Sequence, residues 1–363
     1  MGLKCGIIGL ANVGKTTIFN CMSSTKALTS NVATGTGKSN ISTINVPDNR
    51  LYELEKFQPT ERIVHTTVEI VDIPGLSKTT GKGEGNKFLA DVRNCDALIH
   101  VLRCFDDPSL PHIDGSIDPV RDIETVNFEL QVRDLESVEK KLQKVEKAAK
   151  VGDKEAKKAF EVLSVYKNHL ESFKNASTVP VDEHDKKYVD DLFLLTTKPV
   201  IYVCNVDEKS AVNGNQYSNR VKEFLKDEKT EILIIAGKVE AEISELESED
   251  DRKAFLADVG LTEPGVNKLI RAAYSLLNLE TFFTVGPKEI RAWTIKKGMT
   301  APQAAGVIHS DLERGFIRAE VMKYNDFITL GSEHACREKG KLFVEGKNYV
   351  VEDGDILHIR FNV

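Results

Sequence analysis

The sequence lacks several features that would place it in a membrane, in an export pathway or among disulfide-rich and zinc-binding proteins. No stretch approaches the roughly 20 apolar residues that a membrane-spanning helix needs. The segment Lys4 to Gly9 has the pattern of a buried strand, with no charged, apolar and cleavage regions in series as in an export signal. The six cysteines are far apart and form no C-x-x-C pair, which argues against disulfides and a zinc site. We therefore expect a soluble, cytoplasmic protein with no membrane partner.

Positive charge is also scarce. The chain of 363 residues has 49 lysines and arginines against 56 aspartates and glutamates, a formal net charge of −7 at pH 7. This balance argues against a protein that coats nucleic acid through bulk electrostatics, so no DNA partner is expected, although a local basic face could bind RNA. One run, Lys140 to Lys158, contains eight lysines against three acids. The run is either a contact for a phosphate backbone or a solvated helix face with i,i+4 ion pairs.

The hydrophobic pattern changes along the chain, and the length allows two or three domains. Residues 1–127 and 198–280 contain short buried apolar runs between helical stretches, which predicts one discontinuous α/β domain with a sheet covered on both faces. Residues 128–197 repeat apolar side chains at steps of three and four on either side of a break at Gly152, which predicts an inserted antiparallel helical hairpin. Residues 281–363 alternate in short strands around one helix, which predicts a small α+β domain.

The strands expected in the α/β domain run over Cys5 to Gly9, Thr66 to Ile73, Ala97 to Cys104, Val200 to Cys204 and Glu231 to Ala236. In the last domain the expected strands are Glu289 to Ile295, Ile317 to Val321, Tyr349 to Val351 and Ile356 to Phe361, with a helix from Ala301 to Ser310. The first helix of the hairpin is expected to begin near Phe128. Trp293 falls in one of these strands, as a core residue or as a platform on which a base stacks.

A phosphate-binding motif follows the first strand. The segment Gly9 to Thr16 matches G-x-x-x-x-G-K-[ST] between a predicted strand and a helix that begins near Lys15. The glycines let backbone N–H groups curl around the phosphates, and the helix N-terminus adds its dipole. Lys15 is expected to reach the β and γ oxygens, and the Thr16 hydroxyl to coordinate Mg²⁺. The nucleotide-binding residues expected here are Asn12, Val13, Gly14, Lys15, Thr16 and Thr17.

A second motif, D-x-x-G, ends the strand Thr66 to Ile73. Asp72 is expected to hold Mg²⁺ through water, and the Gly75 N–H to sense the γ-phosphate. Residue 76, where Ras-like GTPases place a Gln that orients the attacking water, is Leu76. Since a leucine cannot position water, hydrolysis must use another group.

Two residues are candidates for completing the hydrolytic site. His112 lies in the loop after the strand Ala97 to Cys104, where its imidazole could orient water or act as a base near neutral pH; the alternative is a histidine of a surface loop. Thr36 lies in the segment Thr29 to Ser42, which is rich in Gly, Ser and Thr. It is either the switch-loop threonine that closes on Mg²⁺ beside Thr16 and Asp72 or a residue of a flexible loop.

Base selection is expected after the strand Val200 to Cys204. A GTPase has N-K-x-D there, with the Asp accepting hydrogen bonds from guanine, whereas this chain has Asn205, Val206, Asp207 and Glu208. Adenine offers an N6 donor beside an N1 acceptor, and a buried hydrogen-bond mismatch discriminates by roughly 10⁴-fold. Asn205, Val206 and Glu208 are therefore the expected base-site residues, although Glu208 could still accept from guanine. The other interpretation is that Asp207 and Glu208 are loop charges only.

Together these motifs resemble the YchF, or Obg-like ATPase, subfamily of the Obg-class P-loop proteins, nearly end to end. The resemblance is carried by Gly6 to Thr17, Val46 to Asp48, Val71 to Leu76, Gly81 to Leu89, Arg103 to Phe105, Asn205 to Glu208, Val239 to Ile243, Arg291 to Thr294, Thr300 to Gly306, Gly315 to Ala319 and Phe361 to Val363. It implies a Ras-like G domain, a coiled-coil insertion and a C-terminal TGS domain of the β-grasp type. The chain departs from the family pattern at residues 32–40, which lack the usual aromatic-Pro-Phe segment around Thr36, and at Ala11, where proline is customary.

The resemblance also implies a function. It implies ATP as the preferred substrate with Mg²⁺, and a link between His112 and hydrolysis. It implies ribosome association, mainly with the large subunit, in translation or stress responses. Our hypothesis is a slow ATPase switch in which Lys15, Thr36, Gly75 and His112 act in hydrolysis, and whose helical and TGS domains engage the ribosome. The alternatives are a GTP-preferring GTPase of the same fold and a ribosome-binding module with vestigial hydrolysis.

Overall fold

The structure is a computed structural model that describes residues 3–24, 40–75 and 82–362. Contacts between residues divide the chain into two compact units, each described here by itself. Among the described residues, the first unit takes in 3–24, 40–42 and 70–266, and the second takes in 43–69 and 267–362. No helix in the described part of the chain is both long enough and apolar enough to cross a membrane.

A six-stranded sheet in the order β2-β4-β1-β5-β6-β7 forms the centre of the first unit, although residues 43–45 of β2 and 67–69 of β4 group with the second unit. The strands are β1 (Lys4–Ile8), β2 (Asn40–Asn45), β4 (Thr67–Asp72), β5 (Ala97–Cys104), β6 (Val200–Val206) and β7 (Glu231–Ile235). The neighbours β1, β5, β6 and β7 pair in parallel. All eight residues of β5 are buried, as expected for a central strand covered on both faces. The five strands predicted for this sheet are thus confirmed to within about two residues at their ends, a normal uncertainty of assignment.

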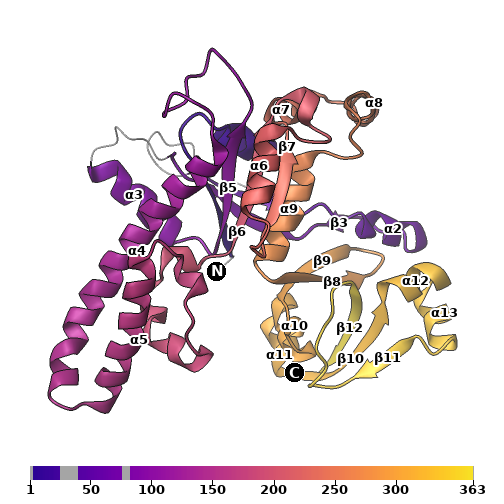
Figure 1. Ribbon diagram of the computed structural model, residues 1–363. Helices are drawn as coiled ribbons and strands as arrows, with labels where there is room; N and C mark the ends of the chain where they lie inside the picture. The colour runs from indigo at the N-terminus through magenta and orange to yellow at the C-terminus, as the bar shows by residue number, and fades with distance from the viewer. Residues whose placement is uncertain (1–2, 25–39, 76–81, 363) are drawn as a thin grey trace. The chain divides into compact units, whose positions relative to one another are not determined.

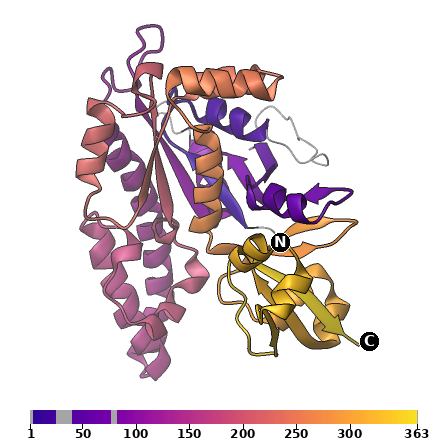
Figure 2. The same cartoon turned by 90° about the vertical axis from the view of Figure 1, so that its right-hand side faces the viewer.

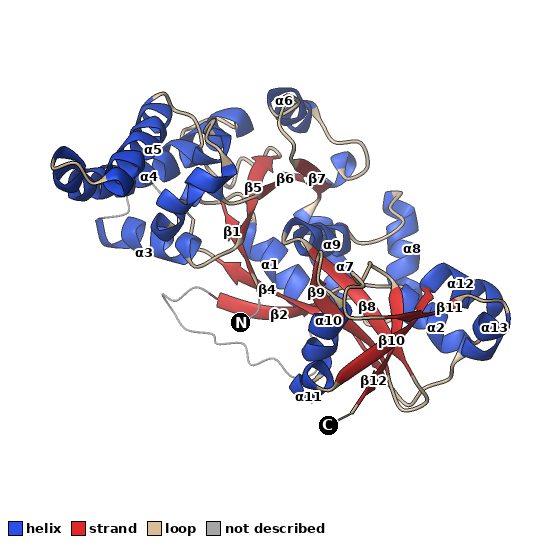
Figure 3. Ribbon diagram, turned by 90° about the horizontal axis from the view of Figure 1, so that it is seen from below, coloured by secondary structure: helices blue, strands red, loops and turns tan. Residues whose placement is uncertain are grey.

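Helices cover both faces of this sheet. The helices of the first unit are α1 (Lys15–Ser23), α3 (Lys82–Arg93), α4 (Pro119–Lys150), α5 (Lys154–Glu171), α6 (Gln216–Phe224), α7 (Gly237–Glu245) and α8 (Glu249–Val259), with short 3₁₀ turns η1 (Ala176–Thr178), η2 (Glu183–Tyr188), η3 (Asp190–Leu192), η4 (Leu195–Thr197) and η5 (Glu208–Ser210). The next helix, α9 (Gly265–Leu276), groups with the second unit from residue 267 on. Figure 3 shows α1 and α7 on one side of the strands and α3 and α4 on the other. The carboxyl ends of the parallel strands are therefore left to the loops that follow them.

The predicted helical hairpin is confirmed, but its start is not where the sequence places it. α4 begins at Pro119 rather than near Phe128, because the Asp118 side chain accepts hydrogen bonds from the N–H groups of Val120 and Arg121 and proline occupies the first helical position. α4 and α5 lie side by side as two long antiparallel helices (Figure 1). Their shared core contains Val138, Val162, Leu163, Tyr166 and Leu170.

A buried carboxylate holds the segment that returns from the hairpin. Asp134 of α4 is fully buried and accepts from the N–H groups of Leu195 and Thr196 at 2.7 and 2.8 Å and from the Thr196 hydroxyl at 2.6 Å. Burial raises the pKa of Asp134, and these hydrogen bonds oppose the shift. The side chain thus fixes where the chain leaves the hairpin and enters β6.

The second unit has a six-stranded sheet in the order β11-β10-β12-β8-β9-β3. Its elements are α2 (Arg50–Phe57), β3 (Ile63–Val64), β8 (Leu279–Val285), β9 (Ile290–Lys296), α10 (Ala301–Ile308), α11 (Ser310–Arg314), β10 (Phe316–Lys323), α12 (Tyr324–Leu330), α13 (Glu333–Glu338), β11 (Leu342–Glu345) and β12 (Asp355–Phe361). The C-terminal strand β12, yellow in Figure 2, pairs antiparallel with β10 and parallel with β8. This is an α+β fold, as predicted.

Several details of the second unit differ from the sequence prediction. One helix was expected in the last domain, and the structure has four, α10 to α13; β11 was not predicted. β8 was not predicted, and residues 349–351, predicted as a strand, form only an isolated bridge between Val350 and Thr300. Residues 43–69, which the sequence places with the first domain, group with the C-terminal part of the chain through α2 and β3. β3 is only two residues long and pairs with β9 through Ile63 and Val64, a contact that no local pattern reveals.

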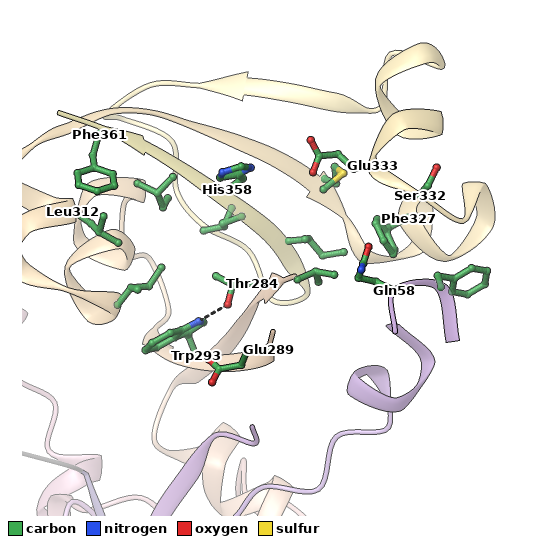
Figure 4. A pocket seen from close by; sticks show the side chains of 17 residues that line it. Gln58, Thr284, Glu289, Trp293, Leu312, Phe327, Ser332, Glu333, His358 and Phe361 are labelled. Carbon is green, nitrogen blue, oxygen red and sulfur yellow. Dashed lines mark hydrogen bonds between the residues drawn. The ribbon is translucent and has the colours of Figure 1, made fainter. Parts of the chain in front are cut away.

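A cavity of about 460 Å³ opens in the second unit, lined mainly by apolar side chains of β8, β9, β12, α11 and α12 (Figure 4). Trp293 lies on its wall, and its Nε1–H donates to the Thr284 hydroxyl at 2.9 Å. Arg291 stacks 4.0 Å from the Trp293 ring centroid, and Phe282 is stacked against the same ring. With these neighbours, Trp293 is part of the packing of the sheet, in line with its interpretation as a core residue.

Candidate nucleotide-binding site

The loop after β1 has the backbone conformation that the phosphate-binding motif requires. Gly9, Asn12 and Gly14 have φ angles of 143°, 62° and 96°. A Cβ at Gly9 would lie 2.5 Å from the Val101 carbonyl, and one at Gly14 would overlap the Asn205 amide, so neither position accepts a larger side chain. The chain then enters α1 at Lys15, as predicted.

Lys15 is buried against its own loop. Its side chain is 7% exposed, and Nζ donates to the Leu10 carbonyl at 2.6 Å. Burial lowers the pKa of Lys15 to about 8, and the charge of Asp72 opposes the shift. A Cβ on Gly75 would lie 2.5 Å from Nζ of Lys15 and 3.1 Å from the Leu10 carbonyl. The D-x-x-G element therefore lies directly against the phosphate-binding loop, and a side chain at residue 75 would displace the head of Lys15.

Thr16 and Asp72, two of the three residues predicted to hold Mg²⁺, lie side by side. The Thr16 hydroxyl donates to Oδ2 of Asp72 at 3.1 Å. Burial raises the pKa of Asp72, and the hydrogen bond from Thr16 and the charge of Lys15 oppose this. A hydroxyl and a carboxylate at this spacing are oxygen donors of the kind that suits Mg²⁺. The donor set therefore fits the ion: Thr16 would be a direct ligand and Asp72 would hold its waters.

Asn205 connects three loops at the carboxyl end of the sheet. Its Nδ2 donates to the Val13 carbonyl at 2.9 Å, and its Oδ1 accepts from the N–H of Gly237 at 2.9 Å. The side chain is 5% exposed, so both bonds are shielded from bulk water. The predicted base-site loop is thus tied to the phosphate-binding loop and to the start of α7.

A cavity of about 920 Å³ adjoins these loops, within the range of ligand sites in proteins. Its lining comes from the phosphate-binding loop, from the segment after β5, from the loop after β6 and from the start of α7: Asn12, Gly14, Thr17, Phe105, Asp106, Asp107, Leu110, Asn205, Val206, Asp207, Glu208, Lys209, Gly237, Lys238 and Ala241. The structure therefore brings residues predicted for phosphate binding and for base selection to one cavity.

The residues of the base-site loop point in different directions. Asp207 accepts from the N–H and the hydroxyl of Ser210 at 3.1 and 3.0 Å and so caps its own turn, η5. The Val206 side chain is 3% exposed and packs in the apolar core with Ala211 and Val239. Glu208 is exposed at the cavity, and its carboxylate forms no hydrogen bond or ion pair with any described residue. Asp207 uses Oδ1 for both of these bonds, whereas neither oxygen of Glu208 is engaged by a described residue, so Glu208 is the less engaged of the two carboxylates.

His112 is buried and fully hydrogen-bonded. Its Nδ1 accepts from the Asp114 N–H at 3.1 Å, so the ring proton is on Nε2, which donates to Oδ2 of Asp122 at 3.0 Å. Arg121 lies close to both partners of this hydrogen bond: its guanidinium is 3.4 Å from Nδ1 of His112 and 3.5 Å from Oδ1 of Asp122. Burial raises the pKa of Asp122, and the contact with His112 opposes this. In this arrangement neither nitrogen of His112 is available to a water molecule.

Two predicted residues lie outside the described residues: Thr36 and Leu76. Other residues of the site were missed by sequence reasoning. Asp122 partners His112, and Arg103 binds the segment after β5. The only signal for Arg103 was a charged residue at the end of an otherwise apolar run, which is uncommon in a buried strand.

The fold and the loop geometry define a P-loop nucleotide-binding protein with a Ras-like G domain. A family model described as a 50S ribosome-binding GTPase matches residues 4–162, and a YchF C-terminal model, described as a protein of unknown function, matches residues 279–362. Proteins named ribosome-binding ATPase YchF from Bacillus subtilis and Haemophilus influenzae are 46% and 47% identical to this chain, with each chain covered completely. The solved Schizosaccharomyces pombe YchF GTPase superposes with a TM-score of 0.87 at 33% identity, covering 99% of this chain and 98% of that one. The chain belongs to the YchF family.

Proposed function

We propose that this protein is a Mg²⁺-dependent ATPase with slow turnover that binds the ribosome and modulates translation or a stress response in the cytoplasm. The observation that carries the proposal is the single cavity formed by the phosphate-binding loop and the loop Asn205 to Glu208. The relatives' names, ribosome-binding ATPase, support the same activity. Lys15 and the N–H groups of residues 12–17 would hold the phosphates, and Thr16 and Asp72 would hold Mg²⁺.

The base-site loop supports a preference for adenine. With Asp207 engaged by Ser210 and with Val206 in the core, this loop offers neither the Asp nor the Lys of a GTPase at their usual positions. The free carboxylate of Glu208 can accept a hydrogen bond from the adenine N6 amine. Because a carboxylate could also accept from guanine N–H groups, only a binding measurement separates the two bases.

The geometry around His112 supports slow hydrolysis. Both ring nitrogens are occupied, by the Asp114 N–H and by Asp122, so His112 must leave Asp122 before it can orient water. If His112 must change its partner before hydrolysis, only the molecules that have made this change can react. The turnover rate is then reduced to that fraction of its maximum. We infer that His112 acts in hydrolysis only after such a step.

The helical hairpin and the C-terminal TGS domain are the proposed ribosome contacts. Lys140, Lys144 and Lys147 are spaced four and three residues apart on α4, are exposed, and form no ion pair with any described residue. Lys154 and Lys157, across the turn at the start of α5, are likewise exposed and unpaired among the described residues. A row of unpaired lysines on a chain of net negative charge suits a phosphate backbone, and the family model's 50S description favours the large subunit.

Nucleotide titration tests the enzymatic part of the proposal. The purified protein is titrated with fluorescent ATP and GTP analogues in Mg²⁺, with unlabelled nucleotides as competitors, and phosphate release is followed in parallel. We expect tighter binding of ATP and slow release of phosphate. Tighter binding of GTP would make the protein a GTPase of the same fold, and nucleotide binding without any phosphate release would leave a ribosome-binding module with vestigial hydrolysis.

Charge reversal tests the ribosome contact. The variant Lys140→Glu/Lys144→Glu/Lys147→Glu should sediment with ribosomes less than the wild type and bind ATP equally well. Lys141 is kept, because its Nζ donates to the Tyr188 carbonyl at 2.7 Å and pairs with Asp191. A control reverses two exposed lysines that form no ion pair with a described residue, Lys222 in α6 and Lys229 beyond it, and is compared with the double variant Lys140→Glu/Lys144→Glu. Equal sedimentation of the two variants would remove the hairpin from the interface.

A further inference from the structure

A buried arginine holds one wall of the nucleotide cavity. Arg103, in β5, is 1% exposed, and its guanidinium donates to three backbone carbonyls of the segment that follows the strand. Nε donates to Phe105 at 3.2 Å, one terminal nitrogen to Leu110 at 2.7 Å, and the other to Asp107 at 3.1 Å. The guanidinium also lies 4.9 Å from the centroid of the Phe105 ring. One side chain thus binds the segment 105–110 near its beginning, middle and end.

These bonds hold the segment in one conformation. A buried guanidinium is strongly unfavourable unless its donors are satisfied, and here the backbone of residues 105–110 supplies the acceptors. Only the planar fork of an arginine offers donors in three directions from one rigid group, and a lysine ammonium cannot reach the same three carbonyls. The conformation of the segment and the satisfaction of Arg103 therefore depend on each other.

The segment forms part of the nucleotide cavity. Phe105, Asp106, Asp107 and Leu110 line it together with the base-site loop. The carbonyl of the next residue, Pro111, accepts from the Asn12 side chain of the phosphate-binding loop at 3.4 Å. A shift of the segment would therefore change both the cavity wall and its contact with the phosphate-binding loop.

Arg103 and Asn205 occupy matching positions in the sheet. They are register partners in the parallel strands β5 and β6, near the carboxyl ends. Asn205 binds the phosphate-binding loop and the start of α7, whereas Arg103 binds the segment after β5. Two buried polar side chains at one level of the sheet thus hold the loops around the cavity.

We propose that Arg103 is a positioning residue of the nucleotide site, which holds the segment 105–110 as the wall against which the nucleoside part of the nucleotide rests. The inference rests on the proposed nucleotide function. In this proposal the two parts of the nucleotide are held by different parts of the site. Residues 9–17, which Arg103 does not touch, bind the phosphates. The segment that Arg103 holds contacts the nucleoside. Substitution of Arg103 should therefore weaken the binding of nucleotides more than the binding of an inorganic polyphosphate.

The test compares Mg-ATP with Mg-tripolyphosphate, which carries the phosphates without a nucleoside. Dissociation constants are measured for the wild type, Arg103→Lys and Arg103→Met by competition against a fluorescent ATP analogue. If the segment occupies its present conformation only a tenth of the time, ATP affinity falls about tenfold, and we expect at least this loss for both variants. Tripolyphosphate affinity should change less than about twofold, because the contact between this stretch and the phosphate-binding loop is one long hydrogen bond, from Asn12 to the Pro111 carbonyl at 3.4 Å.

Arg252→Lys is the matched control, since Arg252 donates to the Leu246 carbonyl at 2.7 Å outside the cavity lining. Hydrogen exchange of residues 105–112 in folded Arg103→Lys should be faster than in the wild type and in Arg252→Lys. If Arg103→Met does not fold, Arg103→Lys carries the same comparison. Equal losses for both ligands, or unchanged ATP affinity, would overturn the role of Arg103 and leave the nucleotide function standing. A wild type that binds neither ligand would overturn the proposed function and this inference with it.

Discussion

Replacing Asn205 with alanine should release the loops that meet at the nucleotide cavity. The side chain makes two shielded hydrogen bonds, to the Val13 carbonyl and from the Gly237 N–H, both at 2.9 Å. Alanine leaves that carbonyl and that N–H without their partner. An unpaired buried polar group costs about 1–3 kcal/mol, and water from the adjoining cavity relieves part of this cost, so we expect the free energy of unfolding to fall by about 2–4 kcal/mol.

Scanning calorimetry measures this loss. In a unit of about 150–250 residues, each kcal/mol lowers Tm by about 2–4 °C, so the transition of the first unit should fall by about 5–15 °C. Asp207→Ala is the matched control in the same loop. Its carboxylate is exposed and, among the described residues, bonds only to Ser210 of its own turn, so Tm should fall by less than about 3 °C.

The same two variants should differ in their affinity for ATP. Asn205→Ala frees the loop after β6 from the phosphate-binding loop, and we expect ATP affinity to fall at least about tenfold. If Asn205→Ala melts within about 2 °C of the wild type and binds ATP equally well, the two hydrogen bonds do not hold the loops together. A loss of stability with normal ATP affinity would show that the cavity forms without this connection.

Three further changes test other parts of the structure. Gly75→Ala should slow ATP turnover at least about tenfold in phosphate-release assays, because its Cβ would lie 2.5 Å from Nζ of Lys15. The pKa of Lys15 is lowered to about 8 in the folded protein, so above that pH the unfolded chain holds one more proton at this lysine than the folded protein does. The free energy of unfolding of the nucleotide-free protein should therefore rise from about pH 8 to about pH 10. In urea unfolding, Lys15→Met should remove this rise. Asp134→Ala should lower the unfolding free energy by about 2–4 kcal/mol in the same assay, because it leaves the N–H groups of Leu195 and Thr196 unpaired.

The parts of the site that follow from local patterns were predicted from the sequence. The phosphate-binding loop and the D-x-x-G element each end a buried strand, and parallel strands bring their carboxyl ends to one edge of a sheet. This geometry places Thr16 beside Asp72 and Gly75 beside Lys15, as expected. Asn205 joins them because β6 follows β5 in the sheet.

The parts that depend on distant contacts were not predicted. β8 shows no alternation, because Phe282 faces one apolar cluster and Phe283 the other, so both are buried. In the sequence, the apolar residues of β8 therefore look like a continuation of the preceding helix α9, and no strand was predicted there. Residues 43–69 carry the pattern of an ordinary helix and a two-residue strand, and only their contacts group them with the C-terminal unit.

The interaction of His112 with Asp122 shows a further limit. A histidine and an acid ten residues apart in a loop and a helix have no fixed spacing in space, so sequence allowed a catalytic or a surface histidine. The structure gives a third state, a buried histidine with both nitrogens occupied. This state would reconcile a role of His112 in acid–base chemistry with the slow turnover that we propose, because hydrolysis would wait on a change of hydrogen-bond partner.

Arg103 was missed and Asn205 was expected only at the base site, and the contacts that both make were hidden from the sequence for the same physical reason. Each ends an apolar strand whose pattern predicts burial, and burial of a polar side chain is favourable only when its hydrogen bonds are satisfied. Their partners are backbone groups, which any sequence supplies, so no residue type signals the contact. A polar residue near the carboxyl end of a buried parallel strand therefore indicates that its hydrogen bonds hold the loops at that end of the sheet. In an α/β fold those loops form the ligand site, so such a residue is worth testing even when it touches no ligand.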